Sequence, residues 1–314
     1  MIDERECENE SFDEACSLRG TFFRWLTGLF FRLFRKSLMR KGRKYSEISR
    51  SGWKAPKGFT LEKFNINGVY AEMLVPDNAA DGKVILQLHG GAYITGFNNL
   101  YRRNACLYSK MAGNVRVMSV DYRLAPENPY PAALEDTLAS YRLLLEQGYS
   151  PDKIIFVGDS AGGGLSLAAA MALRDGGKPV PVALVLMSPW ADLAAEGKSH
   201  KEKYEIDPMF GRKTRGGGIS ALAYTTRENL KGPYVSPAYG SFDGMPPMLI
   251  HVGEYEVLLS DSETVADKAR AAGIPVEFKM WRGMFHVFQM YYGFIPEAYR
   301  SIKMICRFIK EAFK

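Results

Sequence analysis

Residues 154–175 read IIFVGDSAGGGLSLAAAMALRD and contain the pattern from which a fold is predicted. The apolar run 154–157 predicts a buried strand, and residues 161–174 predict a helix. Between them, residues 158–162 match G-x-S-x-G, in which a serine occupies a strained turn between a strand and a helix. Small neighbours are required because the chain and a substrate approach each other closely there. The stretch therefore predicts Ser160 as a nucleophile in an α/β protein.

The sequence around this stretch alternates short β-branched runs with longer helical ones. Strands are predicted at 84–88, 115–120, 154–157, 182–187, 248–252 and 276–280, and helices at 131–147, 161–174, 261–272 and 296–313. The strands are apolar nearly throughout, which is typical of strands covered on both faces. We therefore expect a mostly parallel central sheet with helices on both faces. Residues 193–233 interrupt the alternation with a charged, strandless insertion, placed where α/β proteins bind ligands.

A second glycine-containing motif follows the predicted strand 84–88. Residues 89–92 read HGGA and are similar to the HGGG motif that supplies oxyanion donors in lipases and esterases. Glycines leave main-chain N–H groups unobstructed, so they can stabilise one developing negative charge. We expect an oxyanion hole that comprises Gly90, Gly91 and Ala92 together with Ala161. We expect the imidazole of His89 to brace the loop by hydrogen bonding.

The general base is selected by counting, because the chain has four histidines. In this kind of site the order along the chain is serine, then acid, then histidine. His200 lies in the insertion, and His251 lies within a predicted strand, where a structural role is expected. His286 follows the last predicted strand and is predicted to be the base.

The acid is less well defined. Glu254, Glu256 and Asp261 all follow the predicted strand 248–252, and each could hold the histidine tautomer. Asp261 has a competing expected role as the N-cap of the helix 261–272. Spacing alone leaves the three carboxylates as alternatives.

Composition limits the class of protein. The 314 residues are 46% hydrophobic and 24% charged, as in globular proteins with one large domain and an embellishment. Four cysteines without CxxC spacing indicate neither a metal site nor a disulfide framework. We therefore expect no metal and no cofactor, and reduced thiols in a cytoplasmic protein. The net charge is +6, and the basic residues gather near the N-terminus. We expect no nucleic-acid partner.

The N-terminal charges are strongly segregated. Residues 3–14 hold seven acids, whereas residues 19–44 hold nine arginines or lysines and no acid, interspersed with aromatic residues and leucines. The preceding acids argue against a secretory signal. The apolar run is too short and too often interrupted by arginine for a membrane-spanning helix. Two alternatives remain for this helical segment: a membrane-surface contact through residues 19–44, or a cap over the active site.

Six motifs in order identify a family resemblance: HGGAY at 89–93, DYRLAPE at 121–127, YPAALED at 130–136, GDSAGG at 158–163, SPWADL at 188–193 and GxxExLxxD at 253–261. Over about residues 60–312 the chain resembles the hormone-sensitive-lipase family of carboxylesterases, also called bacterial family IV. The resemblance implies an α/β-hydrolase fold with a helical cap formed by residues 1–50 and 193–233. The core would then comprise residues 51–192 and 234–314.

The resemblance also implies an activity. It implies a serine esterase that acts on small-molecule esters of short to medium acyl chain, with Glu256 as the acid and Asp261 as the fallback. DYRLAPE is expected to be architectural, with Asp121 and Arg123 paired locally and Pro126 in a turn behind the oxyanion loop. Two other functions are kept as alternatives: a membrane-surface lipase, and a ligand-binding protein that has lost catalysis. A homodimer is left open.

Overall fold

A computed structural model describes residues 16–50, 52–214 and 220–314, apart from the side chains of residues 35–50. The strands are β1 (Phe59–Ile66), β2 (Val69–Pro76), β3 (Val84–Leu88), β4 (Arg116–Asp121), β5 (Ile154–Asp159), β6 (Ala183–Met187), β7 (Met248–Gly253) and β8 (Val276–Trp281). The helices are α1 (Leu18–Arg50), α2 (Asn99–Met111), α3 (Ala132–Glu146), α4 (Ala161–Asp175), α5 (Ser199–Glu202), α6 (Leu259–Ala271) and α7 (Pro296–Ala312), and single 3-10 turns occupy Pro151–Lys153, Pro237–Tyr239 and Phe288–Tyr291.

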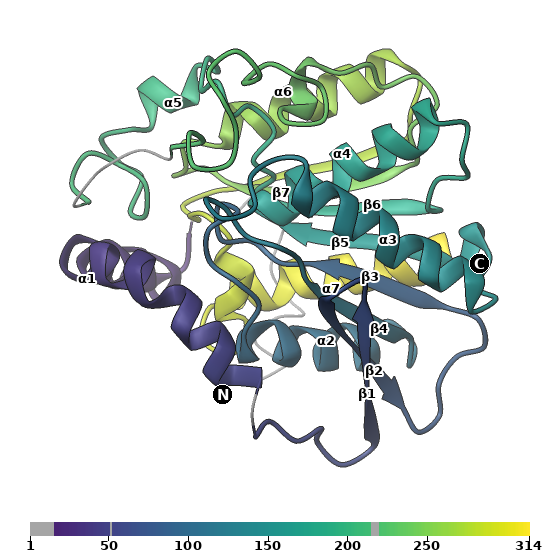
Figure 1. Ribbon diagram of the computed structural model, residues 1–314. Helices are drawn as coiled ribbons and strands as arrows, with labels where there is room; N and C mark the ends of the chain where they lie inside the picture. Colours follow the sequence, from purple (N-terminus) through teal and green to yellow (C-terminus); the bar gives the residue numbers. More distant parts are fainter. Residues whose placement is uncertain (1–15, 51, 215–219) are drawn as a thin grey trace.

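The eight strands form one sheet in the order β1-β2-β4-β3-β5-β6-β7-β8. The six strands from β4 to β8 in this order pair in parallel, whereas β2 is antiparallel to both β1 and β4. Helices α3, α4 and α6 lie on one face of the sheet, and α2 and α7 lie on the other (Figure 1). The expected α/β class, with a mostly parallel sheet covered on both faces, is confirmed.

The central strands are apolar throughout because both of their faces are covered. In β3, Leu86 packs with Leu165 of α4, whereas its neighbour Ile85 packs in a second cluster with Ile305 of α7. Successive side chains of a strand point to opposite faces, so each strand contributes to both cores. Continuous apolar runs are the result.

Three elements differ from the expectations. The hairpin of β1 and β2 was not predicted, because β1 lies at the sheet edge and carries polar residues at several exposed positions. Helix α2 was also not predicted. Helix α6 begins at Leu259 with Leu258 as its N-cap residue, so the expectation that Asp261 caps this helix is wrong.

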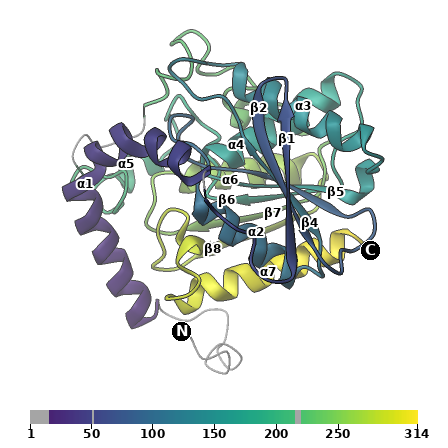
Figure 2. The same ribbon diagram turned by 60° about the horizontal axis from the view of Figure 1, so that its bottom comes forward.

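Two segments lie beside the sheet's carboxyl edge. Helix α1 runs along the outside of the molecule (Figure 2), and the described part of 193–233 forms turns together with the short helix α5. Within the residues that the structure describes, no helix has the length and apolar character needed to cross a bilayer.

Candidate active site

Ser160 lies between β5 and α4, in the strand–turn–helix setting that G-x-S-x-G predicts. Its φ of 52° and ψ of −121° are rare for a residue with a side chain. Two glycines allow this turn: a Cβ on Gly158 would collide with the carbonyl oxygen of Gly162, and a Cβ on Gly162 with that of Leu88. Ser160 is only 6% exposed and stands at the N-terminus of α4, where the helix dipole favours negative charge.

The loop after β3 presents main-chain donors near this turn. Gly91 and Ala92 have φ values of 119° and 54°. At such positive φ values the peptide groups point in directions that residues in ordinary helices and strands do not reach. Within the described parts of the chain, no hydrogen bond occupies the N–H groups of Gly91, Ala92 and Ala161. These three groups are therefore available to an oxyanion.

Gly90 behaves differently from its neighbours. Its N–H donates to the Tyr101 hydroxyl at 2.9 Å and to Asp159 Oδ1 at 3.1 Å. The expectation that Gly90 belongs to the oxyanion hole is corrected, because its only N–H already has acceptors inside the protein. Gly90 instead fastens the oxyanion loop to Asp159, the residue that precedes Ser160.

His89 supports the same loop. Its Nδ1 lies 2.7 Å from the Gly90 carbonyl oxygen, and its ring stacks on Tyr122 with centroids 4.0 Å apart. The Tyr122 hydroxyl donates to the His89 carbonyl oxygen at 2.6 Å. Behind the loop, the N–H of Ala125 donates to the carbonyl oxygen of Tyr93 at 2.8 Å, which joins it to the segment containing Pro126.

The expected local pair of Asp121 and Arg123 does not form. Arg123 instead holds Asp136 on α3, with its Nε 2.9 Å from Oδ1 and its main-chain N–H donating to Oδ2 at 2.8 Å. Asp121 accepts the N–H of Phe97 at 3.4 Å. Asp121 is buried, whereas the Arg123 side chain is partly exposed and pairs with Asp136 on α3.

His286 meets Glu256 on the loops after β8 and β7. The imidazole Nδ1 and the carboxylate Oε2 lie 2.8 Å apart, and both side chains are buried. The other oxygen, Oε1, accepts the Ser188 hydroxyl at 2.8 Å and the N–H of Gly253. The Ser188 oxygen also accepts the N–H of Val287 at 3.3 Å. Both carboxylate oxygens therefore have assigned partners, which fixes the orientation of the imidazole.

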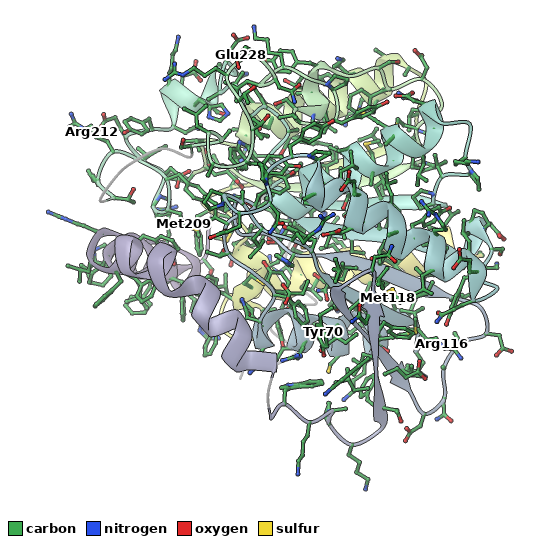
Figure 3. The ribbon with its side chains drawn as sticks, viewed as in Figure 1. Tyr70, Arg116, Met118, Met209, Arg212 and Glu228 are labelled. Carbon is green, nitrogen blue, oxygen red and sulfur yellow. The ribbon has the colours of Figure 1, made fainter. Side chains whose placement is uncertain are left out.

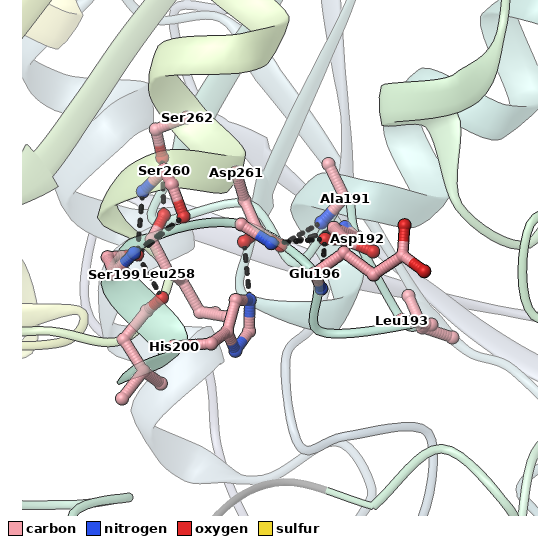
Figure 4. A network of polar contacts seen from close by, with 12 residues as sticks. Ala191, Asp192, Leu193, Glu196, Ser199, His200, Leu258, Ser260, Asp261 and Ser262 are labelled. Carbon is pink, nitrogen blue, oxygen red and sulfur yellow. Dashed lines mark hydrogen bonds and ion pairs between the residues drawn. The ribbon is translucent and has the colours of Figure 1, made fainter. Parts of the chain in front are cut away.

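Asp261 belongs to a different network (Figure 4). Its Oδ1 lies 2.8 Å from Nε2 of His200, and its Oδ2 accepts the N–H groups of Ala191 and Asp192. Burial opposes protonation of His200, but the hydrogen bond with Asp261 and the negative charges of Asp261, Asp192 and Asp207 together outweigh it and raise the imidazole pKa. Asp261 thus fastens the insertion to α6, and of the sequence-predicted acids only Glu256 contacts His286.

Three carboxyl and imidazole groups of this network, from Asp192, His200 and Asp261, lie within 4.8 Å of one another. The Asp192 oxygens accept the N–H groups of Ala194, Glu196 and Gly197. The carboxylates already accept hydrogen bonds from these N–H groups. The three side chains therefore join the insertion to the core through hydrogen bonds.

Two buried carboxylates that the sequence did not single out lie near His286. Burial raises the pKa of Asp159 to about 6, although attraction to His286 opposes the increase. Burial likewise raises the pKa of Asp207, which accepts the N–H groups of Val257, Met209 and Phe210. Asp159 lies within GDSAGG and could have been suspected from the motif, whereas nothing in the sequence distinguished Asp207.

Asp207 positions part of the insertion over the site. The Phe210 and His286 rings pack edge to face, with their centroids 4.9 Å apart. Met209, labelled in Figure 3, packs with Phe23 of α1 against the cluster that contains Phe285. Both the insertion and α1 therefore reach the loop that carries His286.

His251 has the structural role that its strand position predicts. It is fully buried in β7, and its Nδ1 lies 2.7 Å from the hydroxyl of Ser301 on α7. Burial lowers its pKa to about 3, with Lys279 and Arg307 adding to the effect. A neutral imidazole with one fixed partner joins β7 to α7.

Comparison with known proteins gives consistent results. A family model described as alpha/beta hydrolase fold matches residues 85–290. An acetyl-hydrolase of Streptomyces hygroscopicus is 42% identical over 232 residues, which cover 74% of this chain and 77% of that protein. The carboxylesterase/phospholipase LipF of Mycobacterium tuberculosis is 35% identical over 269 residues, covering 83% and 71%.

Solved structures agree with the sequence relatives. A hormone-sensitive lipase from a metagenome library has a TM-score of 0.85 and 37% identity, and the match covers 96% of this chain and 100% of that one. The matched region contains the β5 turn and the loops after β3, β7 and β8 on which the site is built. This chain belongs to the alpha/beta-hydrolase fold family, within the hormone-sensitive-lipase group of esterases.

Proposed function

We propose that Ser160, His286 and Glu256 form the catalytic triad with which this esterase hydrolyses carboxylic esters. The observation that carries the proposal is the 2.8 Å contact between His286 and Glu256 on loops at the edge where Ser160 stands. A carboxylate that holds the Nδ1 side of an imidazole leaves Nε2 to take a proton from a serine. No cofactor enters this mechanism.

In the proposed reaction the Ser160 hydroxyl adds to the ester carbonyl carbon as His286 accepts its proton. The carbonyl oxygen becomes an oxyanion bound by the N–H groups of Gly91, Ala92 and Ala161. His286 then protonates the leaving alcohol, which leaves an acyl group on Ser160. Water attacks this acyl-enzyme with His286 again as the base, and the carboxylic acid departs as the serine is restored.

The short-to-medium acyl preference is also a proposal. It is supported by the Phe210 ring, which covers part of the space beside His286, and by the acetyl-hydrolase name of the Streptomyces relative. A bulky ring near the reacting atoms limits the room for an acyl chain. We expect p-nitrophenyl esters with acyl chains of about four to eight carbons to be hydrolysed faster than those with about sixteen, because the pocket would have a limited volume.

The decisive experiment compares Ser160→Ala with Ser262→Ala on p-nitrophenyl butyrate. Ser262 is a buried serine whose hydroxyl donates to the Leu258 carbonyl oxygen on α6, away from the proposed triad. Ser160→Ala is expected to lower kcat by about 10⁴-fold or more, as in other serine hydrolases. Ser262→Ala should retain kcat. A Ser160→Ala enzyme with wild-type kcat would contradict the mechanism.

The cap assignment of residues 1–50 and 193–233 is retained as a proposal. It is supported by the contacts of α1 and of Phe210 with the His286 loop.

A cytoplasmic location is likewise proposed, on the ground that Cys16, Cys106 and Cys306 are free thiols. Homodimer formation is best tested by sedimentation velocity of the purified chain. The non-catalytic alternative is disfavoured by the presence of His286 in contact with Glu256.

A further inference from the structure

Helix α1 is docked with most of its large apolar side chains facing away from the protein. Toward the body it presents Gly20, which approaches Met284, the buried Thr27, and Gly28, which approaches Pro208. These positions are spaced seven and one residues apart and share one helical face. Helices on a globular core normally bury the bulky apolar face instead. Phe23 does pack against the body, but most of the bulky apolar side chains among residues 18–34 lie outside the contact.

The opposite faces of α1 are unusually apolar and exposed. In the described part of the chain, eight of the thirteen exposed large hydrophobic residues belong to this helix, between residues 18 and 34. Trp25 is 62% exposed, Phe22 54% and Leu33 52%. The set comprises Leu18, Phe22, Trp25, Leu26, Leu29, Phe30, Leu33 and Phe34. A contiguous apolar surface of this kind marks an interaction site.

The docking of α1 is held by specific contacts. The Ser17 hydroxyl and N–H both donate to Glu297 of α7, at 2.9 and 2.6 Å. Arg24 donates to the Gly283 carbonyl oxygen at 2.7 Å and stacks on the Tyr255 ring, 4.0 Å from its centroid. Because these contacts, together with the packing of Phe23, fix one face of α1 on the protein, most of its apolar side chains stay outward.

The charge of residues 19–44 indicates what kind of partner binds this surface. Residues 19–44 carry nine basic residues and no acid. Two copies of the chain that met through α1 would bring two such segments together, and their like charges would repel. An anionic lipid surface would attract them, and it would accept tryptophan, phenylalanine and leucine at the headgroup boundary. No helix in the described part is suited to span the bilayer, so the contact would be peripheral.

We propose that α1 is a membrane-docking element that lays its exposed apolar faces, from residues 18 to 34, into the surface of an anionic phospholipid bilayer. Gly283, the residue that Arg24 holds, lies three residues before His286. Docking through α1 therefore brings the loop of the proposed base close to the lipid. Esters that partition into the membrane surface would be delivered beside the site.

Vesicle sedimentation of the full-length chain tests this proposal. The vesicles are phosphatidylcholine alone or phosphatidylcholine with phosphatidylglycerol, and all variants carry Ser160→Ala so that hydrolysis cannot alter the lipid. Binding thus reads out independently of the proposed catalytic function. We expect the anionic vesicles to bind the chain at least about tenfold more tightly than neutral ones, and salt to weaken that binding.

The variants test the apolar face and its charge separately. Trp25→Ser and Leu33→Ser should each weaken binding by about tenfold, because each removes an exposed side chain that the lipid would bury. Arg32→Glu should weaken it by about fivefold or more. The matched control is Leu222→Ser in the insertion, since Leu222 is also about half exposed, at 49%, and is remote in sequence from α1. That control should bind as tightly as the parent.

Three results would overturn the proposal. The first is absence of binding to anionic vesicles at low salt by chains whose circular dichroism is that of the folded parent. The second is a Trp25→Ser, Leu33→Ser double variant that keeps wild-type lipid binding while losing self-association in sedimentation velocity, since α1 would then contact a second copy. The third is binding only after deletion of residues 1–15, which would indicate that the acidic segment covers α1.

Discussion

The Glu256→Gln substitution tests the proposed triad most directly, because the surrounding hydrogen bonds determine how the amide must orient. In the native protein Oε1 accepts two donors, the Ser188 hydroxyl and the Gly253 N–H, while Oε2 faces Nδ1 of His286. A glutamine that keeps both donors must place its carbonyl oxygen at the Oε1 position. Its NH₂ group then points at Nδ1 of His286.

An NH₂ group in that position can only donate, so Nδ1 must accept and the imidazole proton moves to Nε2. A protonated Nε2 cannot take the proton of Ser160. The wrong tautomer in serine hydrolases lowers kcat by about 10⁴-fold, which corresponds to about 5 kcal/mol of transition-state stabilisation. Folding should be affected much less, because the amide is nearly isosteric and retains its other contacts.

The assay is steady-state hydrolysis of p-nitrophenyl butyrate by wild type, Glu256→Gln and Asp261→Asn. Asp261→Asn is the matched control, since Asp261 is an equally buried carboxylate that contacts His200 rather than His286. We expect kcat to fall by about 10⁴-fold for Glu256→Gln and by less than about tenfold for Asp261→Asn. The reverse order, or a Glu256→Gln enzyme within tenfold of wild type, would refute the assignment of the acid.

Three further predictions concern stability. Burial raises the pKa of Asp159 to about 6, above its ordinary value of 3.8, so the folded protein binds this proton more tightly than the unfolded chain does. The ionised carboxylate therefore destabilises the fold fully above pH 6, and this cost disappears as the pH falls toward 4; Asp159→Asn should raise the free energy of unfolding by about 1–3 kcal/mol at pH 8 and not at pH 4. Urea denaturation at both pH values checks this, and an equal difference at both would contradict it. Gly162→Ala should destabilise the protein by about 3 kcal/mol or more, because its Cβ would meet the Leu88 carbonyl oxygen; Gly293→Ala, where the new Cβ meets nothing within 4 Å, should change the melting temperature by little. Arg102→Met should cost about 3–5 kcal/mol, since Glu72, 2.7 Å from Arg102 Nε, would remain buried without its cationic partner. The double variant Glu72→Gln, Arg102→Met should recover part of that loss, and no recovery in urea denaturation would count against the buried-charge explanation.

The local sequence determined most of the core elements. Each central strand is a run of apolar residues that needs cover on both faces, and the pattern shows this without knowledge of its partners. The turn at Ser160 was predictable for the same reason, because its glycines prevent collisions with atoms that lie within the motif or on the adjoining strand. The edge strand β1 was missed because its exposed positions carry polar residues.

Only the tertiary structure distinguished groups of the same chemistry. Glu256 and Asp261 are five residues apart, and the sequence left both as possible acids. Glu256 contacts His286 because it lies on the loop after β7, beside the loop after β8, whereas Asp261 lies in the first turn of α6 and faces the insertion. Gly90 was grouped with Gly91 by its motif, yet its N–H is directed at Asp159 and Tyr101.

The orientation of α1 is the clearest case of this division. The sequence of residues 18–34 determined that a helix here would be apolar and basic, since both properties are local. Which face it buries depends on contacts with Gly283, Tyr291 and Glu297, more than 250 residues away along the chain. Local periodicity measures how apolar a helix face is, but only packing against distant residues decides whether that face meets the protein or its surroundings.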